Sequence, residues 1–188
     1  MELKLAYRTG TYFGFDGLGN TDPSQSDFKY YATVQSWAAS KNIDFQFVNS
    51  HEKASAVRDT SKRATLESSI RNRLSVSKQM VIILSTDTRS TGSMLSYEIE
   101  KAIDLYNLPL ILSYTGVDSM LSPGNYSHRW PTSLKSRLQS NKAKAIHIPF
   151  KKNALLDAIS QFSVNGKQLN SSMETYSRAA QQKWGYLN

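Results

Sequence analysis

Two uninterrupted apolar runs constrain the fold of this chain more than any other feature. The first is QMVIILST at residues 79–86, and the second is LPLILSYTG at residues 108–116. A strand with one wet face alternates apolar and polar residues, whereas a strand buried on both faces is a continuous apolar run. Such strands occur mainly in parallel sheets that helices cover on both sides. The two runs therefore predict the centre of a parallel sheet.

Helix and strand patterns alternate along the rest of the chain. Further strands are predicted at residues 11–16, 43–50 and 143–150. An alternating segment at residues 2–7 is a second candidate for the first strand, and the sequence leaves open which of the two is central. Amphipathic segments predict helices at residues 28–41, 62–77, 94–106, 133–140 and 153–162. This alternation predicts a doubly wound α/β domain with a mainly parallel five-stranded sheet and helices on both faces.

The end of the chain departs from this alternation. Residues 1–163 hold the α/β pattern, and residues 164–188 form a linker followed by one more helical segment. Ser171 and Glu174 match the S-x-x-E capping box that begins many helices. Apolar residues then recur at helical spacing, at Leu169, Met173, Tyr176, Ala180 and Trp184. We expect this C-terminal helix to pack on the domain, with a partner-binding helix as the alternative.

The composition excludes several classes of site. The 188 residues include no cysteine and only three histidines. Disulfides, thiolate metal sites and cysteine nucleophiles are therefore excluded, and no metal site is expected. No apolar run approaches the ~20 residues needed to cross a membrane, and the N-terminus lacks the pattern of a secretory signal. These features are typical of a cytoplasmic protein that makes no membrane contact.

The net charge of +8 is confined to the last third of the chain. Residues 1–128 hold 13 basic and 13 acidic residues, whereas residues 129–188 hold 10 basic and 2 acidic residues. A basic surface can bind nucleic acid. These lysines, however, are scattered among helix, turn and strand signals and lack the interleaved aromatic residues of a single-strand groove. A solvated face is the favoured interpretation, and nucleic acid is not an expected partner.

One acidic residue, Glu98, is set apart by its place in the segment MLSYEIEKAI, residues 94–103. The apolar stripe of this helix consists of Leu95, Ile99, Ala102, Ile103 and Tyr106. Glu100 lies well outside the stripe and should be solvated, whereas Glu98 borders it and should be half-buried. Glu98 also closely follows a predicted strand, at the edge where open α/β sheets bind ligands. On position alone, an acid that suits the helix dipole explains Glu98 at least as well.

The segment QMVIILSTDTRSTGSMLSYEIEKAI, residues 79–103, resembles the third strand, loop and following helix of a TIR domain. It is most similar to the TIR-like proteins of bacterial Thoeris anti-phage systems, of the ThsB type. Catalytic TIR domains carry an essential glutamate in a segment like W-x-x-x-E-[IL]. The matching segment here is MLSYEI, so that glutamate falls on Glu98 and Met94 replaces the usual tryptophan. In element order, the resemblance covers residues 11–163.

The resemblance implies chemistry on NAD+, as a substrate rather than a cofactor. Enzymatic TIR domains cleave the bond between nicotinamide and ribose, and those of Thoeris systems release a cyclic ADP-ribose-type signal that activates a separate effector. One carboxylate suits this reaction, because the transition state is oxocarbenium-like and nicotinamide leaves as a neutral base. Cyclisation then depends on positioning the adenine. A phage-derived trigger and self-association are the other partners that the resemblance implies.

Further residues leave the predicted strands at the same edge as Glu98. Phe15 could stack on nicotinamide or adenine, and Arg89 could pair with a pyrophosphate. The others could hydrogen-bond to ribose, amide or phosphate groups. The predicted substrate-binding residues are Phe15, Asp16, Asn20, Asn49, His51, Ser85, Thr86 and Arg89. Core packing for Phe15, and ordinary turn or surface-loop roles for the others, are the alternatives.

Two rival functions fit the same pattern. A nucleoside deoxyribosyltransferase-like enzyme has a similar fold and uses a glutamate as a nucleophile at an anomeric carbon. A non-enzymatic TIR module acts by self-association, and Glu98 would then be structural. A phospho-receiver domain is disfavoured, because it expects a phosphorylatable aspartate at the end of the third strand, where Ser85 and Thr86 stand and Asp87 comes one residue late.

Overall fold

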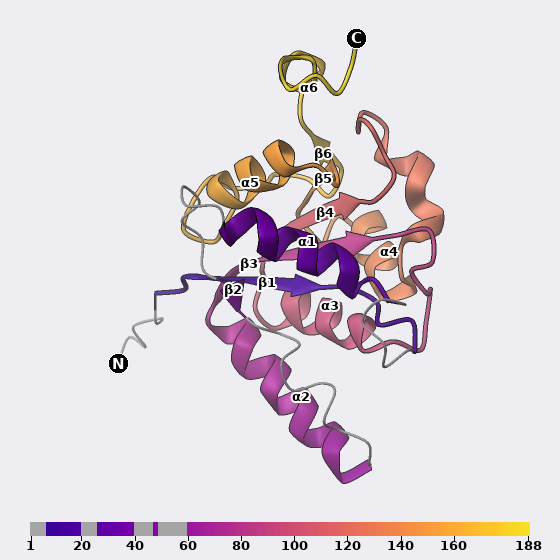
Figure 1. The fold of residues 1–188 in the computed structure, drawn as a ribbon. Coiled ribbons are helices and arrows are strands. Elements are labelled where there is room, and N and C mark those ends of the chain that lie inside the picture. The colour runs from indigo at the N-terminus through magenta and orange to yellow at the C-terminus, as the bar shows by residue number, and fades with distance from the viewer. Residues whose placement is uncertain (1–6, 20–25, 40–46, 49–59) are drawn as a thin grey trace.

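The computed structural model describes residues 7–19, 26–39, 47–48 and 60–188. The sheet that these residues form has six strands, all parallel, in the order β2-β1-β3-β4-β5-β6 (Figure 1). The strands are β1 (Gly10–Gly14), β2 (Phe47–Val48), β3 (Ser77–Leu84), β4 (Leu110–Tyr114), β5 (Ala145–Pro149) and β6 (Glu174–Thr175). The parallel sheet predicted from the sequence is confirmed.

The two apolar runs form the central strands β3 and β4. β3 lies between β1 and β4, and β4 lies between β3 and β5. All five residues of β4 are buried, and so is every residue of β3 from Gln79 onward. The first strand is central too, and it is supplied by the segment at residues 11–16. Most of the rival segment, residues 2–7, lies outside the described residues.

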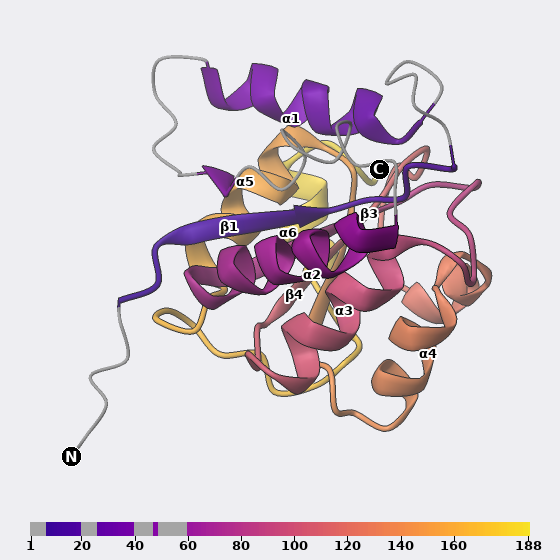
Figure 2. The ribbon, with the colours of Figure 1, turned by 90° about the horizontal axis from the view of Figure 1, so that it is seen from below.

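Helices cover both faces of the sheet (Figure 2). One face carries α1 (Phe28–Ala39) and α5 (Lys152–Gln161), and the other carries α2 (Thr60–Ser75), α3 (Met94–Asp104) and α4 (Thr132–Gln139). A short 3-10 helix, η3 (Pro123–Arg129), precedes α4. This is the doubly wound arrangement that the alternation predicts. Within the described part of the chain, no helix is both long and apolar enough to cross a membrane.

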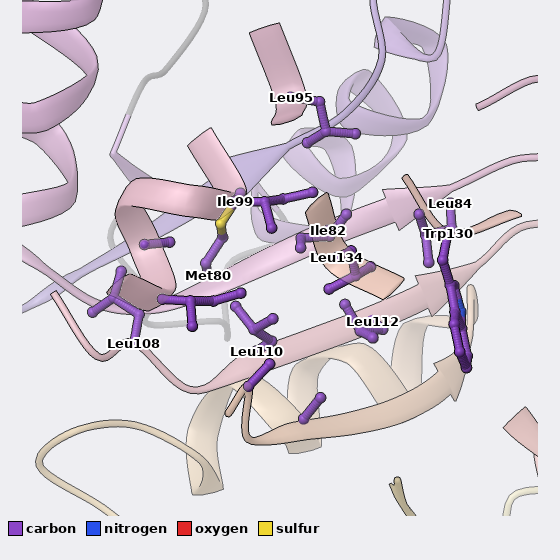
Figure 3. Close-up of a cluster of buried hydrophobic side chains, with 14 of the residues drawn as sticks. Met80, Ile82, Leu84, Leu95, Ile99, Leu108, Leu110, Leu112, Trp130 and Leu134 are labelled. Carbon is purple, nitrogen blue, oxygen red and sulfur yellow. The ribbon is translucent and has the colours of Figure 1, made fainter. Parts of the chain in front are cut away.

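The larger core lies between the sheet and the face that carries α2, α3 and α4 (Figure 3). Side chains two apart in a strand share a face, so β3 and β4 each contribute alternate residues to it. Among its members are Met80, Ile82, Leu84, Leu95, Ile99, Leu110, Leu112, Trp130 and Leu134. Burying an apolar side chain of this size contributes about 1.5–3 kcal/mol. This core fixes the position of α3 on the sheet.

The C-terminal segment differs from its prediction in two ways. The helix expected to begin at Ser171 begins later, as α6 (Arg178–Lys183), and the side chain of Ser177 caps it. The two residues of β6 pair with β5 and add a sixth strand to the five predicted. The physical reason is the pairing with β5: Glu174 and Thr175 lie opposite Ile146 and His147 in the sheet, and Ala145 N donates to Ser171 O, so this backbone serves the sheet rather than a helix.

Buried contacts attach this segment to the rest of the domain. Gln181 is 1% exposed, and its side-chain amide both donates to Met120 O and accepts from Met120 N, each at 2.8 Å. The Tyr176 hydroxyl donates to Asp157 of α5. Tyr176 and Trp184 also pack against the core on the α1 and α5 face. The segment therefore joins the loop after β4 to α5.

Candidate active site

The strand order reverses at the boundary between β1 and β3. After β1 the chain forms β2 on one side of it, and it then returns to form β3 on the other side. In open α/β sheets, ligands bind outside the carboxyl ends of the strands at such a switch point. The segments that leave β1 and β3, together with the first half of α3, frame the candidate site.

Glu98 lies against the end of β1, next to Gly14. Its side chain is 4% exposed. A Cβ atom built on Gly14 would lie 3.2 Å from Glu98 Oε2 and 2.5 Å from Met80 Cε, so only glycine leaves this space open. The carboxyl is buried further than the half-burial predicted, because the helical pattern does not show that β1 covers this side of α3. Glu100 keeps partial exposure.

The environment of Glu98 favours its protonated form. Burial raises the pKa of Glu98 to about 8, although the Tyr12 hydroxyl and the positive charge of Arg73 both lower it. The negative charge of Asp16 adds to the rise. Among the described residues, neither Glu98 Oε2 nor Tyr12 Oη has a hydrogen-bond partner of ordinary geometry. Glu98 is thus a buried carboxyl with an unsatisfied oxygen, a state that is costly and typical of functional sites.

Asp16 lies at the same edge, two residues beyond Gly14, but its oxygens are occupied. Arg89 donates to Asp16 from its backbone N at 2.8 Å, from Nε at 3.0 Å and from Nη2 at 2.7 Å, and Leu18 N donates at 2.9 Å. Burial alone would raise the pKa of Asp16, but these hydrogen bonds outweigh it and the pKa lies below its usual range. The Asp16 side chain is fully buried, whereas that of Arg89 is 39% exposed. Arg89 therefore reaches solvent while one edge of its guanidinium is fixed.

Asp27 and Ser85 join the connections after β1 and β3 at a second point. Asp27 directly precedes α1 and is 1% exposed, and Ser85 Oγ donates to its Oδ2 at 2.9 Å. Ser85 N in turn donates to Thr88 Oγ1 at 2.9 Å, which closes the turn after β3. Burial raises the pKa of Asp27 to about 6 against the effect of the Ser85 hydrogen bond, and the charge of Asp16 adds to the rise. Asp16 and Asp27, which follow β1, therefore both accept hydrogen bonds from the segment that follows β3.

A family model described as the TIR-like domain of the Thoeris protein ThsB matches residues 12–118. The chain belongs to this family. The match begins in β1 and ends in the loop after β4, so it contains every site residue described above. Membership in the ThsB TIR-like family confirms the resemblance carried by residues 79–103 and gives the chain a role in Thoeris defence.

This ThsB-type domain brings four of the predicted site residues together. Glu98, Asp16, Ser85 and Arg89 all lie where β1 and β3 meet α3. The hydroxyl of Ser85 and the carboxylate of Asp16 are engaged by protein groups, so Arg89 and Glu98 have the most capacity for a ligand. No group of three or more potential metal-binding side chains occurs among the residues that the structure describes.

The other predicted residues are placed elsewhere or lie outside the described residues. Phe15 points to the α1 face, where it is 5% exposed and stacks on Tyr31 with ring centroids 5.5 Å apart. That position is the core packing that the sequence offered as its alternative. Thr86 is exposed at the end of β3. The residues outside the described ranges are Asn20, Asn49 and His51.

Sequence reasoning missed Tyr12, Gly14 and Asp27. A signal for the first two was present, because alternate residues of a strand share a face. Asp16 marks the ligand edge, so positions 12 and 14 had to lie on its side of the sheet. Asp27 had no such signal, since an acid directly before a helix is usually a cap.

Proposed function

We propose that this chain cleaves NAD+ between nicotinamide and ribose, and forms a cyclic ADP-ribose-type product that activates a separate effector in Thoeris defence. One observation carries the proposal. In a ThsB TIR-like domain, the glutamate of the family-like segment is a buried carboxyl at the switch point of the sheet, and one of its oxygens has no partner within residues 7–19, 26–39, 47–48 and 60–188. A solvated or dipole-compensating acid would have no reason to be buried there.

Cleavage of the bond between nicotinamide and ribose needs one ionised carboxylate. As the bond between the anomeric carbon and nicotinamide breaks, nicotinamide takes the electron pair and leaves neutral, while positive charge develops on the ribose. Glu98, when ionised, stabilises that charge in a site that excludes water. The cationic nicotinamide ring of NAD+ favours the charged form of Glu98, so substrate binding itself lowers the pKa of the carboxyl. An adenine nitrogen then bonds to the anomeric carbon and a proton leaves to solvent.

Arg89 is the residue best suited to the diphosphate of NAD+. Asp16 holds its Nε and Nη2, which sets the plane of the guanidinium. The donors that do not face Asp16 can bind phosphate oxygens, for which the fork of an arginine is well shaped. Asp16 then acts through Arg89 rather than on the ribose, because its own oxygens already accept four or more hydrogen bonds.

The test compares two identical substitutions on one helix. Cells that express the wild-type chain, Glu98→Gln or Glu100→Gln are challenged with phage, and their small-molecule extracts are analysed by mass spectrometry and added to the partner effector. We expect Glu98→Gln to lose about 10²–10³-fold of the product and Glu100→Gln to match wild type. Wild-type extracts that contain no such product, or equal product from Glu98→Gln, would overturn the proposal. Purified protein is also incubated with NAD+ and with deoxynucleosides. Release of free base from the nucleoside, with NAD+ untouched, would favour the rival transferase.

A further inference from the structure

Tyr12 and Glu98 lie next to each other on one side of β1. Tyr12 is two residues before Gly14 on the strand, so the two positions share a face. Glu98 Oε2 lies against Gly14 on that same face. Tyr12 is fully buried and Glu98 is 4% exposed. The phenol and the carboxyl are therefore neighbours in a space closed to water.

The two groups complement each other chemically. Tyr12 Oη is a donor and Glu98 Oε2 an acceptor, and both are buried without a partner of ordinary geometry among the described residues. Leaving either group unsatisfied is costly. Burial raises the pKa of Tyr12 well above its ordinary value, and the Glu98 carboxylate raises it further. Tyr12 thus keeps its proton at any working pH and can only donate toward Glu98.

We infer that Tyr12 is a positioning residue for Glu98, whose hydroxyl donates to the carboxylate when Glu98 ionises and fixes its orientation toward the ligand edge. The inference rests on the function proposed above. A hydrogen bond to a charged group is about twice as strong as one between neutral groups, so the Tyr12 bond is stronger when Glu98 is ionised. It favours that state over the protonated one.

Two other charged groups near Glu98 also affect its ionisation. Arg73 of α2 contributes a positive charge that favours ionisation, and Asp16 a negative charge that opposes it. Arg89 pairs with Asp16 and so offsets part of that opposition. Within this set, Tyr12 is the neutral donor that acts at short range, because its side chain lies on the same face of β1 as the Glu98 carboxyl.

The test is Tyr12→Phe, which removes only the hydroxyl, with Tyr106→Phe as a matched control. Tyr106 packs against the same core just beyond the other end of α3. The carboxyl carbon of Glu98 is titrated by NMR in protein labelled with 13C-glutamate, and its signal is assigned by its loss in Glu98→Gln. We expect the Glu98 pKa to rise by about one unit in Tyr12→Phe and to stay unchanged in Tyr106→Phe. An unchanged pKa in folded Tyr12→Phe overturns the inference.

A second readout separates this inference from the proposed function. Extracts of phage-challenged cells that express Tyr12→Phe should hold about tenfold less product, because one unit of pKa changes the ionised fraction about tenfold. Tyr106→Phe extracts should match wild type. If wild-type cells make no product while the titration still shows the shift, the proposed function fails but the coupling of Tyr12 to Glu98 stands. If product forms and the titration shows no shift, the proposed function stands and the coupling of Tyr12 to Glu98 fails.

Discussion

Two carboxyl groups, Asp16 and Glu98, lie on the same side of β1 and are both almost completely buried. Asp16 accepts hydrogen bonds from the backbone and guanidinium of Arg89 and from Leu18 N, and its pKa is lowered. Glu98 has an oxygen without a partner in the part of the chain that the structure describes, and its pKa is raised to about 8. The difference shows that burial alone does not set the ionisation of these two acids. What separates them is whether the protein itself satisfies the group.

The first prediction concerns the stability of these two sites. Asp16→Asn removes the charge that Arg89 and the turn after β3 are built around, and should cost about 2–3 kcal/mol of unfolding free energy. That is less than the 3–5 kcal/mol typical of a fully buried pair, because Arg89 is 39% exposed. Glu98→Gln should instead raise the free energy of unfolding at pH 8, because the amide is neutral where the buried carboxyl of wild type is partly ionised. Urea denaturation measures both, and equal losses from the two variants would contradict the comparison.

The second prediction is a difference in pH dependence. The folded-state pKa of Glu98 is about 8 and the unfolded value is about 4.3, so the folded state binds the proton more tightly. Its contribution to stability is complete at low pH and is lost as pH rises through this window. Wild type should therefore lose about 1.4 kcal/mol relative to Glu98→Gln between pH 6.5 and 7.5. Urea denaturation curves of wild type and Glu98→Gln that shift equally over this range would contradict the raised pKa.

The third prediction concerns Gly14, which gives Glu98 its place. In Gly14→Ala the new Cβ would meet Met80 Cε at 2.5 Å and Glu98 Oε2 at 3.2 Å. The end of the Met80 side chain can move, so we expect a stability loss of about 1 kcal/mol together with a larger loss of product in phage-challenged cells. Gly124→Ala is the control, because a Cβ there meets nothing within 4 Å. Normal product from Gly14→Ala would show that the close contact is not needed.

The parts of this molecule that depend on local patterns could be predicted from the sequence, whereas parts that depend on distant partners could not. The apolar runs predicted β3 and β4, and the helical stripe distinguished Glu98 from Glu100. Nothing in the sequence showed that Asp16 would be saturated by Arg89, because that pairing joins residues 73 positions apart. For the same reason the helix start predicted at Ser171 was wrong, since Glu174 and Thr175 pair with Ile146 and His147 of β5, which are distant in the chain.

The smallest effect is expected at a third acid, Asp104, six residues beyond Glu98 on the same helix. It pairs with Arg137 and with Lys142, and its own side chain is 33% exposed. These partners lower the pKa of Asp104, through the hydrogen bond from Arg137 above all. Exposed pairs contribute only about 0.2–1 kcal/mol and are screened by salt. Asp104→Asn should therefore lower the free energy of unfolding by less than about 1 kcal/mol, as measured by urea denaturation. This loss should be smaller still in high salt, and product formation should be unchanged. If Asp104→Asn lost as much unfolding free energy as Asp16→Asn, pairing irrespective of burial would set how much each carboxylate contributes to stability.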